Sequence, residues 1–514
     1  MVIKVLLLVI FFAGMVVIGI SARRHAVSVS GFVLGGRSVG PWLTAFAYGT
    51  SYFSAVVFVG YAGQFGWKYG IASTWIGLGN AAIGSLLAWV VLGRRTRIMS
   101  QHLNSSTMPD FFEKRFDSKP LKIAASVIVF VFLIPYTASI YNGLSRLFEM
   151  AFHIPYAVCV VVMAGFTAVY VILGGYMATA ISDFIQGLIM LVGIVVVIGA
   201  VLTGEGGFMQ AVSQLAQIPS DAAPTLGQPG AFASFFGPDP VNLLGVVILT
   251  SLGTWGLPQM IQKFYAIRNE KAVRTGTVIS TVFAVIVSGG CYFLGGFGRL
   301  FEDPAIYGAD GAVVYDSIIP CMLSKLPDVL IGIVVVLVLS ASMSTLSSLV
   351  LTSSSTLTLD LIKDNLWKNM KEESQIWMMR VLIAVFIAIS VVLAINPPGF
   401  IAQLMGISWG ALAGAFLAPF LYGIYWKRVT RAAIWASFAC GVGLTVLNLF
   451  FSFIDSPINA GAAAMVLGLI VVPVVSLITP RQPEKRLQEI FACYQEETVL
   501  HKKMVVGTDK DNQE

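Results

Sequence analysis

The sequence predicts an all-α integral membrane protein, and three observations support this fold class. Of the 514 residues, 57% are hydrophobic and 11% are charged, and the mean hydropathy is +0.83. A water-soluble domain of this length could not be covered by so little polar surface. Apolar runs of about 20 residues, long enough to cross a bilayer, recur along the chain. The third observation is the uneven placement of Lys and Arg between these runs.

We expect thirteen membrane spans, which places the two ends of the chain on opposite sides of the membrane. The spans lie near residues 3–21, 41–62, 71–93, 121–148, 156–176, 183–203, 240–262, 276–297, 327–357, 379–396, 400–424, 431–452 and 460–479. The first run lacks the charged start and the cleavage site of a signal peptide. We therefore expect it to be retained as a helix.

The positions of Lys and Arg test this count independently. If the N-terminus lies outside, 27 of the 32 basic residues fall in segments assigned to the cytoplasm. The long connection between residues 202 and 248 has none and is assigned to the outside. This asymmetry is the positive-inside pattern. The net charge of +6 therefore reports membrane topology, and we expect no nucleic-acid partner.

Sequence motifs of enzyme chemistry do not occur. The four His form no HExxH pair, the five Cys show no CxxC spacing, and there is no P-loop. We therefore expect no enzyme and favour a secondary transporter. A channel would need a continuous polar pore, whereas hydroxyls concentrate in one span, and a sensor would need a fused signalling domain.

The hydroxyls of that span form the stretch "SASMSTLSS", residues 340–348. Ser340, Ser344, Ser347 and Ser348 recur on one helix face. Such groups at membrane depth must be satisfied by protein, water or ligand. Close helix packing or bonds back to the helix's own carbonyls are the alternative to a polar site.

Transporters commonly combine such hydroxyls with the free carbonyls of an interrupted helix. The second span is weakened by "GTS" at 49–51, and the seventh by Gly253, Gly256 and Pro258. Two interrupted helices five spans apart predict an inverted repeat of five plus five helices. Asp183, in "ISDFIQG" and without a Lys or Arg nearby in the sequence, is either a helix N-cap or a cation ligand.

Five stretches together resemble the sodium:solute symporter family. They are "FVLGGRSVGPWLTAFAYGTSYFSA", "TMPDFFEKRF", "VILGGYMATAISDFIQG", "GLPQMIQKFYAIRNEKAVRTG" and "SASMSTLSSLVLTSSSTLTLDL". The resemblance covers residues from about 30 to 430 and implies a LeuT-like 5+5 inverted-repeat core with about 13 transmembrane helices. It implies an extra helix over 1–30, repeats over 31–203 and 240–424, an extracellular loop over 204–239, peripheral helices over 425–479 and a cytoplasmic tail over 480–514.

The resemblance also implies binding residues. For Na+ they are the carbonyls of Thr50, Phe53 and Ala341 and the hydroxyls of Ser344 and Thr345. A second sodium could use Asp183 with Ser342, and proton coupling through Asp183 is the rival to sodium. The substrate-binding candidates are Ser51, Tyr52, Ser54, Thr250, Thr254, Trp255, Pro258 and Trp409, with Tyr141 and Asn142 as weaker ones.

The substrate is expected to be a small organic acid. The proline branch has an aspartate where this chain has Tyr52, whereas "SYFSAVVFVG" is more similar to the pantothenate and monocarboxylate branches. A carboxylate would suit free amides at a broken-helix N-terminus. Proline, other amino acids and sugars are the alternatives. The expected partners are this solute, sodium and the lipid bilayer, and we expect a single chain to be able to function.

Overall fold

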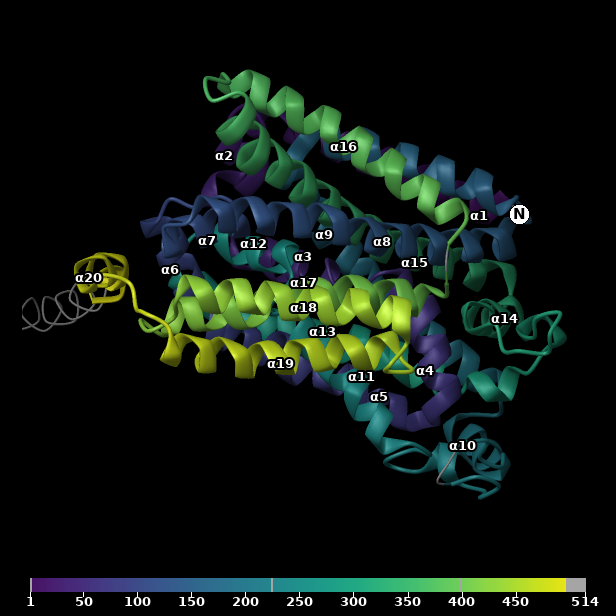
Figure 1. The fold of residues 1–514 in the computed structure, drawn as a ribbon. Coiled ribbons are helices and arrows are strands. Elements are labelled where there is room, and N and C mark those ends of the chain that lie inside the picture. Colours follow the sequence, from purple (N-terminus) through teal and green to yellow (C-terminus); the bar gives the residue numbers. More distant parts are fainter. Residues whose placement is uncertain (1, 223–224, 398, 496–514) are drawn as a thin grey trace, which may run out of the picture.

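The fold is a bundle of long helices, seen in a computed structural model that describes residues 2–222, 225–397 and 399–495 (Figure 1). No β-strand occurs within these ranges, so the predicted all-helical membrane class is confirmed. Eleven helical runs among the described residues are long and apolar enough to cross a membrane.

The long helices are α1 (Val2–Ala22), α8 (Lys119–Phe152), α9 (Tyr156–Gly204), α13 (Glu270–Gly295), α15 (Asp328–Thr356), α16 (Glu372–Ile395), α17 (Ile401–Tyr425), α18 (Arg431–Phe451) and α19 (Pro457–Ile478). The shorter ones are α2 (Val29–Leu34), α3 (Pro41–Thr50), α4 (Ala62–Tyr69), α5 (Thr74–Gly79), α6 (Arg94–His102), α7 (Met108–Phe116), α10 (Phe208–Gln217), α11 (Pro240–Gly253), α12 (Pro258–Ala266), α14 (Ile318–Ser324) and α20 (Glu484–Phe491). Wider π-helical turns cover Val56–Tyr61, Asn80–Leu87, Trp89–Gly93 and Leu357–Leu366.

Two helical runs contain parts of two predicted spans, which reconciles eleven runs with thirteen spans. Tyr156–Gly204, 49 residues, holds the spans 156–176 and 183–203, and Val56–His102, 47 residues, holds the end of 41–62 and all of 71–93. At about 1.5 Å per residue, each would be more than twice the bilayer's hydrocarbon thickness if it were straight. Gly70 (φ 60°, ψ −141°) and Gly175 (φ 55°, ψ −149°) break them. A side chain is disfavoured in this backbone region, so both reversals depend on glycine.

The break at Gly175 corrects the expectation that Asp183 caps a helix. The spans were predicted to part between residues 176 and 183, but the helix resumes directly after Gly175. Asp183 therefore lies about two turns after the break in α9, where its carboxylate accepts no hydrogen bond from the described residues. The N-cap interpretation is wrong.

Two further spans are interrupted where glycine, serine and proline predicted it. In the second span, α3 ends at Thr50 and helical structure resumes with the π-helical turns at Val56. In the seventh, α11 ends at Gly253 and α12 begins at Pro258, a residue that needs no hydrogen-bond partner for its nitrogen at a helix start. Both interruptions lie at mid-span.

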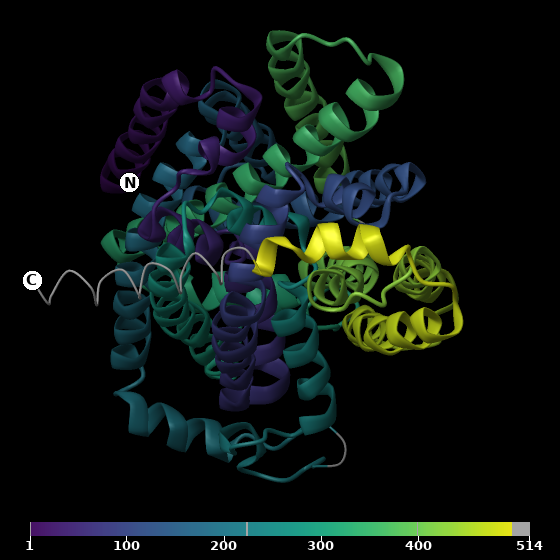
Figure 2. The same cartoon turned by 90° about the vertical axis from the view of Figure 1, so that its left-hand side faces the viewer.

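Helix α15 is the central element of the bundle. It packs against α8, α9 and α16, and every residue from 340 to 356 is buried. The figures show α1 and α16 at the rim, together with α18 and α19 (Figures 1 and 2). The hydroxyls of residues 340–348 therefore face protein and not lipid.

The basic segments gather at one end of the bundle, where Figure 1 shows α2, α6, α7 and α20. The opposite end carries α10 and α14, and α10 belongs to the long connection without Lys or Arg. Helix α20, at the start of the predicted tail, is amphipathic and buries Leu487, Ile490 and Phe491. The rest of that tail, residues 496–514, lies outside the described residues.

The connection before α15 contains a buried acidic group, Asp316. Its Oδ2 accepts a hydrogen bond from the backbone nitrogen of Ile401, the first residue of α17, at 3.2 Å. Burial raises the pKa of Asp316 to about 6, while the bond from Ile401 and the charge of Arg146 act in the opposite direction. The folded protein therefore binds a proton at this carboxyl more tightly than the unfolded chain does.

We predict that Asp316 makes the protein less stable as the pH rises from about 4 to about 6, by up to about 3 kcal/mol. The ionised form is the one that burial disfavours, so the loss is complete above pH 6 and absent below pH 4. Thermal unfolding of the wild type and of Asp316→Asn across this range measures it. The difference between the two melting curves should change with pH only in this window. Parallel curves would contradict the prediction.

Candidate functional site

Five oxygens from the second span and α15 converge at the centre of the bundle. Ser344 Oγ lies 3.1 Å from the carbonyl oxygen of Thr50 and 3.0 Å from that of Ala341. Thr345 Oγ1 lies 3.0 Å from the carbonyl oxygens of Thr50 and Phe53 and 3.1 Å from that of Ala341. The structure thus brings together all five residues nominated for sodium.

The hydroxyl of Thr345 lies near more hydrogen-bond acceptors than it can donate to. A hydroxyl has one hydrogen, yet three carbonyl oxygens lie within 3.1 Å of it. The partial negative charges of these oxygens therefore concentrate at one point inside the protein. A small hard cation prefers such an all-oxygen environment.

The interruption of the second span exposes these carbonyls. Between Thr50 and Val56 the chain leaves the helical path, so the oxygens of Thr50 and Phe53 turn toward α15. Ser54 Oγ accepts from the nitrogen of Val56 at 3.2 Å and caps the helical turns that follow. Ser342 Oγ accepts from the nitrogen of Ala55 at 3.2 Å. Ser342, nominated for a second sodium, thus fastens the break to α15.

The five-residue cluster is closed to solvent in this structure, since each residue is at most 2% exposed. A cavity of about 710 Å³ at the end with α4 and α11 is lined by Gln64, Lys68, Asp239 and Asn242 among others. A cavity of about 810 Å³ at the basic end is lined mainly by charged residues. Neither cavity includes a residue of the cluster.

A buried ammonium gathers several carboxylates at the basic end. Lys122 Nζ lies 2.7 Å from a carboxylate oxygen of Glu113, 3.3 Å from one of Asp110 and 3.8 Å from one of Asp360. It also contacts Asp364. This hub joins α7 and α8 to the π-helical turns that follow α15. The helix bearing Ser344 is thereby tied to its neighbours at the basic end.

Asp183 lies in a second buried polar group, and here the sequence reasoning needs correction. No basic residue was expected near it, but Lys263 of α12 places Nζ 3.9 Å from its Oδ2. Lys263 had also been counted as a cytoplasmic residue, whereas it is buried. Its Nζ donates to Ser348 Oγ at 3.0 Å, and Ser348 Oγ lies 2.7 Å from Ser51 Oγ. Helix α12 packs against α15 and α3, and this tertiary arrangement brings Lys263 to Asp183 of α9.

Three aromatic side chains lie together beside the break in the second span. The rings of Tyr52 and Trp409 stack with centroids 5.8 Å apart, and Tyr136 of α8 meets Trp409 edge to face at 5.8 Å. All three are buried. Tyr52 OH, Tyr136 OH and Trp409 Nε1 have no hydrogen-bond partner among the described residues. This aromatic trio adjoins the oxygen cluster because Tyr52 lies between Thr50 and Phe53 in the chain.

Among the other substrate candidates, Trp255, Thr254 and Thr250 donate hydrogen bonds to backbone carbonyls, and Pro258 begins a helix. Trp255 Nε1 donates to the carbonyl of Ile83 at 2.9 Å, and Thr254 Oγ1 donates to that of Gly84 at 3.0 Å. Thr250 bonds back to its own helix at 2.9 Å, and Pro258 starts α12. The weaker candidates Tyr141 and Asn142 are buried, and Tyr141 OH and Asn142 Oδ1 have no hydrogen-bond partner among the described residues.

Sequence reasoning missed three residues of these polar groups: Lys263, Tyr136 and Gln259. Gln259, in the first turn of α12, is buried and neither polar atom of its amide has a partner among the described residues. The available signal was a polar pair, Gln259 and Lys263, one turn apart in a short half-helix. For Tyr136 no signal distinguished it from packing aromatics.

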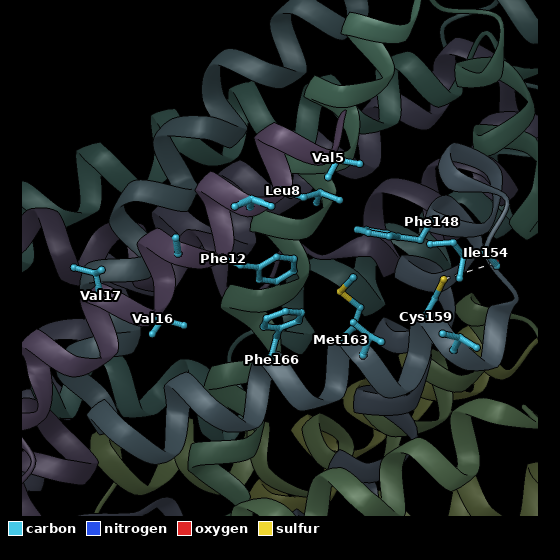
Figure 3. A pocket seen from close by; sticks show the side chains of 14 residues that line it. Val5, Leu8, Phe12, Val16, Val17, Phe148, Ile154, Cys159, Met163 and Phe166 are labelled. Carbon is cyan, nitrogen blue, oxygen red and sulfur yellow. Dashed lines mark hydrogen bonds between the residues drawn. The ribbon is translucent and has the colours of Figure 1, made fainter. Parts of the chain in front are cut away.

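A further cavity, of about 720 Å³, lies between α1 and the start of α9 (Figure 3). The side chains that line it are apolar apart from the thiol of Cys159, and Phe12 stacks on Phe166 within it. It contains no group that could orient a polar solute. We therefore do not count it as part of the functional site.

Comparisons with known proteins point to one family. The sequence profile of the sodium:solute symporter family matches residues 32–441. The chain is 27% identical to the sodium/proline symporter of Salmonella typhimurium, over 94% of each chain. It is 28% identical to an osmoregulated proline transporter of Bacillus subtilis, over 94% of this chain and 96% of that one. The structure of a Na+-coupled sialic acid symporter aligns with a TM-score of 0.76 at 16% identity, covering 93% of this chain and 98% of that one.

We predict that Thr345→Val weakens sodium binding by about tenfold or more, a loss of about 1.4 kcal/mol, because valine keeps the shape and removes one oxygen. Sodium-dependent thermal stabilisation of the purified protein, with choline as the reference cation, measures the affinity. Thr345→Ser keeps the hydroxyl and should retain most of the binding.

Ser347→Ala is the matched control for this pair, since Ser347 donates to its own helix at the carbonyl of Ser344. It should bind sodium as the wild type does. Equal sodium affinity in Thr345→Val and the wild type would show that this hydroxyl is not a ligand.

Proposed function

The chain belongs to the sodium:solute symporter family, and on this basis we propose that it carries a small carboxylate-bearing solute into the cell together with Na+. The observation that carries the proposal is the convergence of five oxygens between the interrupted second span and α15. Within the sequence-derived set, Thr50, Phe53, Ala341, Ser344 and Thr345 would hold the ion. The chemistry of the cluster suits it, since hydroxyl and carbonyl oxygens are hard ligands.

Sodium would act by strengthening the link between two elements. The hydroxyls of Ser344 and Thr345 have two hydrogens for the three carbonyl oxygens of Thr50, Phe53 and Ala341, and a cation among these oxygens would attract all five. Binding therefore favours the conformation in which the second span and α15 are close, which is the one that contains the aromatic trio. One sodium entering across 100 mV contributes about 2.3 kcal/mol before its concentration gradient is counted.

The aromatic trio supports a solute that accepts hydrogen bonds. An indole nitrogen can only donate, and tyrosine hydroxyls donate readily. A carboxylate beside Tyr52, Tyr136 and Trp409 would accept from these otherwise unpartnered groups. Several relatives are sodium/proline symporters, which makes proline the first solute to test. Pantothenate-like and monocarboxylate solutes, which "SYFSAVVFVG" favours, belong to the same chemical class.

The direction of transport follows from the proposed orientation. We place the end with α6, α7 and α20 in the cytoplasm because it gathers the basic segments (Figure 1). The N-terminus then lies outside. The Lys122 hub would close the cytoplasmic entrance while solute and sodium bind from the other side, and its release would open the path inward.

We predict that reconstituted protein takes up at least one of proline, pantothenate and a short monocarboxylate when an inward sodium gradient is imposed. Radiolabelled uptake into proteoliposomes measures this, with potassium or choline replacing sodium in the reference. A proton gradient without sodium should drive no uptake. Proton-driven uptake in sodium-free buffer would instead establish the rival mechanism, with Asp183 as its proton carrier.

We further predict that Trp409→Phe raises the KM for the solute about tenfold or more, because it removes the indole donor and keeps an aromatic ring. The uptake assay with the active solute, at saturating sodium, separates KM from the maximal rate. Trp435→Phe, on α18 and 42% exposed, is the matched control and should leave KM unchanged. An unchanged KM in Trp409→Phe would exclude Trp409 from the solute site.

A further inference from the structure

We propose that the Lys263 ammonium takes the place of a second sodium beside Asp183. The protein therefore binds one sodium per cycle and not two. This inference rests on the proposed sodium coupling and specifies its stoichiometry. It replaces the expectation that Asp183 and Ser342 hold a second sodium.

The first argument is charge balance around Asp183. The carboxylate is fully buried, and neither of its oxygens has a hydrogen-bond partner among the described residues. A buried carboxylate is costly unless an opposite charge lies nearby. Lys263 provides that charge, with Nζ 3.9 Å from Oδ2. The negative charge that would attract a second sodium is therefore already compensated.

The second argument is that the ammonium already binds one of the hydroxyls on the polar face of α15. Lys263 Nζ donates to Ser348 Oγ at 3.0 Å, and Ser348 lies one turn after Ser344. A sodium between Asp183 and Ser348 would have to share this space with Nζ. Two positive charges about 4 Å apart repel strongly in a membrane interior, so they exclude each other.

Ser342 also has another role in this arrangement. Its hydroxyl accepts from the backbone nitrogen of Ala55 at 3.2 Å, which fixes the break in the second span. That bond directs the Ser342 oxygen toward the backbone of the break. No contact joins Ser342 to Asp183 among those described for the two residues, so the pair does not form one site.

The third argument is that this ammonium is coupled to the sodium cluster. Ser348 Oγ lies 2.7 Å from Ser51 Oγ, and Ser51 follows Thr50 directly. A chain of polar contacts thus runs from Asp183 through Lys263, Ser348 and Ser51 to the cluster. It connects α9, α12, α15 and the break after α3. Lys263 is thus a positioning residue that would hold these four elements together in the sodium-bound state.

The test is equilibrium binding of radiolabelled sodium to the purified full-length protein, with choline keeping the ionic strength constant, which counts the ions bound per protein molecule. The wild type should bind one sodium per molecule at saturation. Lys263→Gln removes the charge and keeps a polar side chain of similar reach. It leaves Asp183 uncompensated, so a second sodium should bind and the number of ions bound at saturation should rise toward two. Lys263→Arg should behave as the wild type.

If Lys263→Gln does not fold, the double variant in which both charges are removed still tests the inference. Asp183→Asn leaves the ammonium unopposed and should weaken sodium binding about tenfold or more, whereas Asp183→Asn with Lys263→Gln should restore single-site binding. Two sodium ions bound per wild-type molecule would overturn the inference, as would unchanged binding in both Lys263→Gln and Asp183→Asn. A wild type that binds no sodium would instead overturn the proposed function itself.

Discussion

The need to compensate backbone carbonyls inside a membrane is the constraint on which the rest of this structure depends. The second span stops being helical after Thr50, so its oxygens lose their partners at the depth where water is scarce. The hydroxyls of Ser344 and Thr345 face them, but each has a single hydrogen to give. In the proposed mechanism a cation would complete the balance.

Much of the fold could be predicted because membrane helices leave strong signals. Apolar runs predict the spans, basic residues predict the orientation, and glycine, serine and proline mark the two interruptions. The five cluster residues were nominated through the resemblance to the symporter family. They could be carried over because three of the five oxygens come from the backbone and do not depend on the side chain. The residues Thr50 and Ala341 do lie together in the structure.

What could not be predicted depends on contacts between distant helices. Lys263 reads as a cytoplasmic residue in the sequence, because nothing in its neighbourhood shows that α12 turns it toward Asp183. The sequence gives no reason to distinguish Trp255 from Trp409 as substrate ligands. In the structure the indole of Trp255 donates to Ile83, whereas that of Trp409 has no hydrogen-bond partner among the described residues. The break between the fifth and sixth spans was predicted between residues 176 and 183, but it lies at Gly175. Its position is set by the backbone at Gly175 and not by the apolar pattern.

The spacing within the oxygen cluster has a consequence for ion selectivity. The five contacts between hydroxyl and carbonyl oxygens all lie between 3.0 and 3.1 Å. Any ion that enters must push these oxygens apart, and the displacement grows with the radius of the ion. The oxygens belong to two elements fixed elsewhere, by Ser342 on one side and by the Lys122 hub on the other. If the cluster holds sodium as proposed, a larger alkali ion would strain the whole frame, and discrimination against potassium would be a mechanical property of the bundle as much as a chemical property of the ligands.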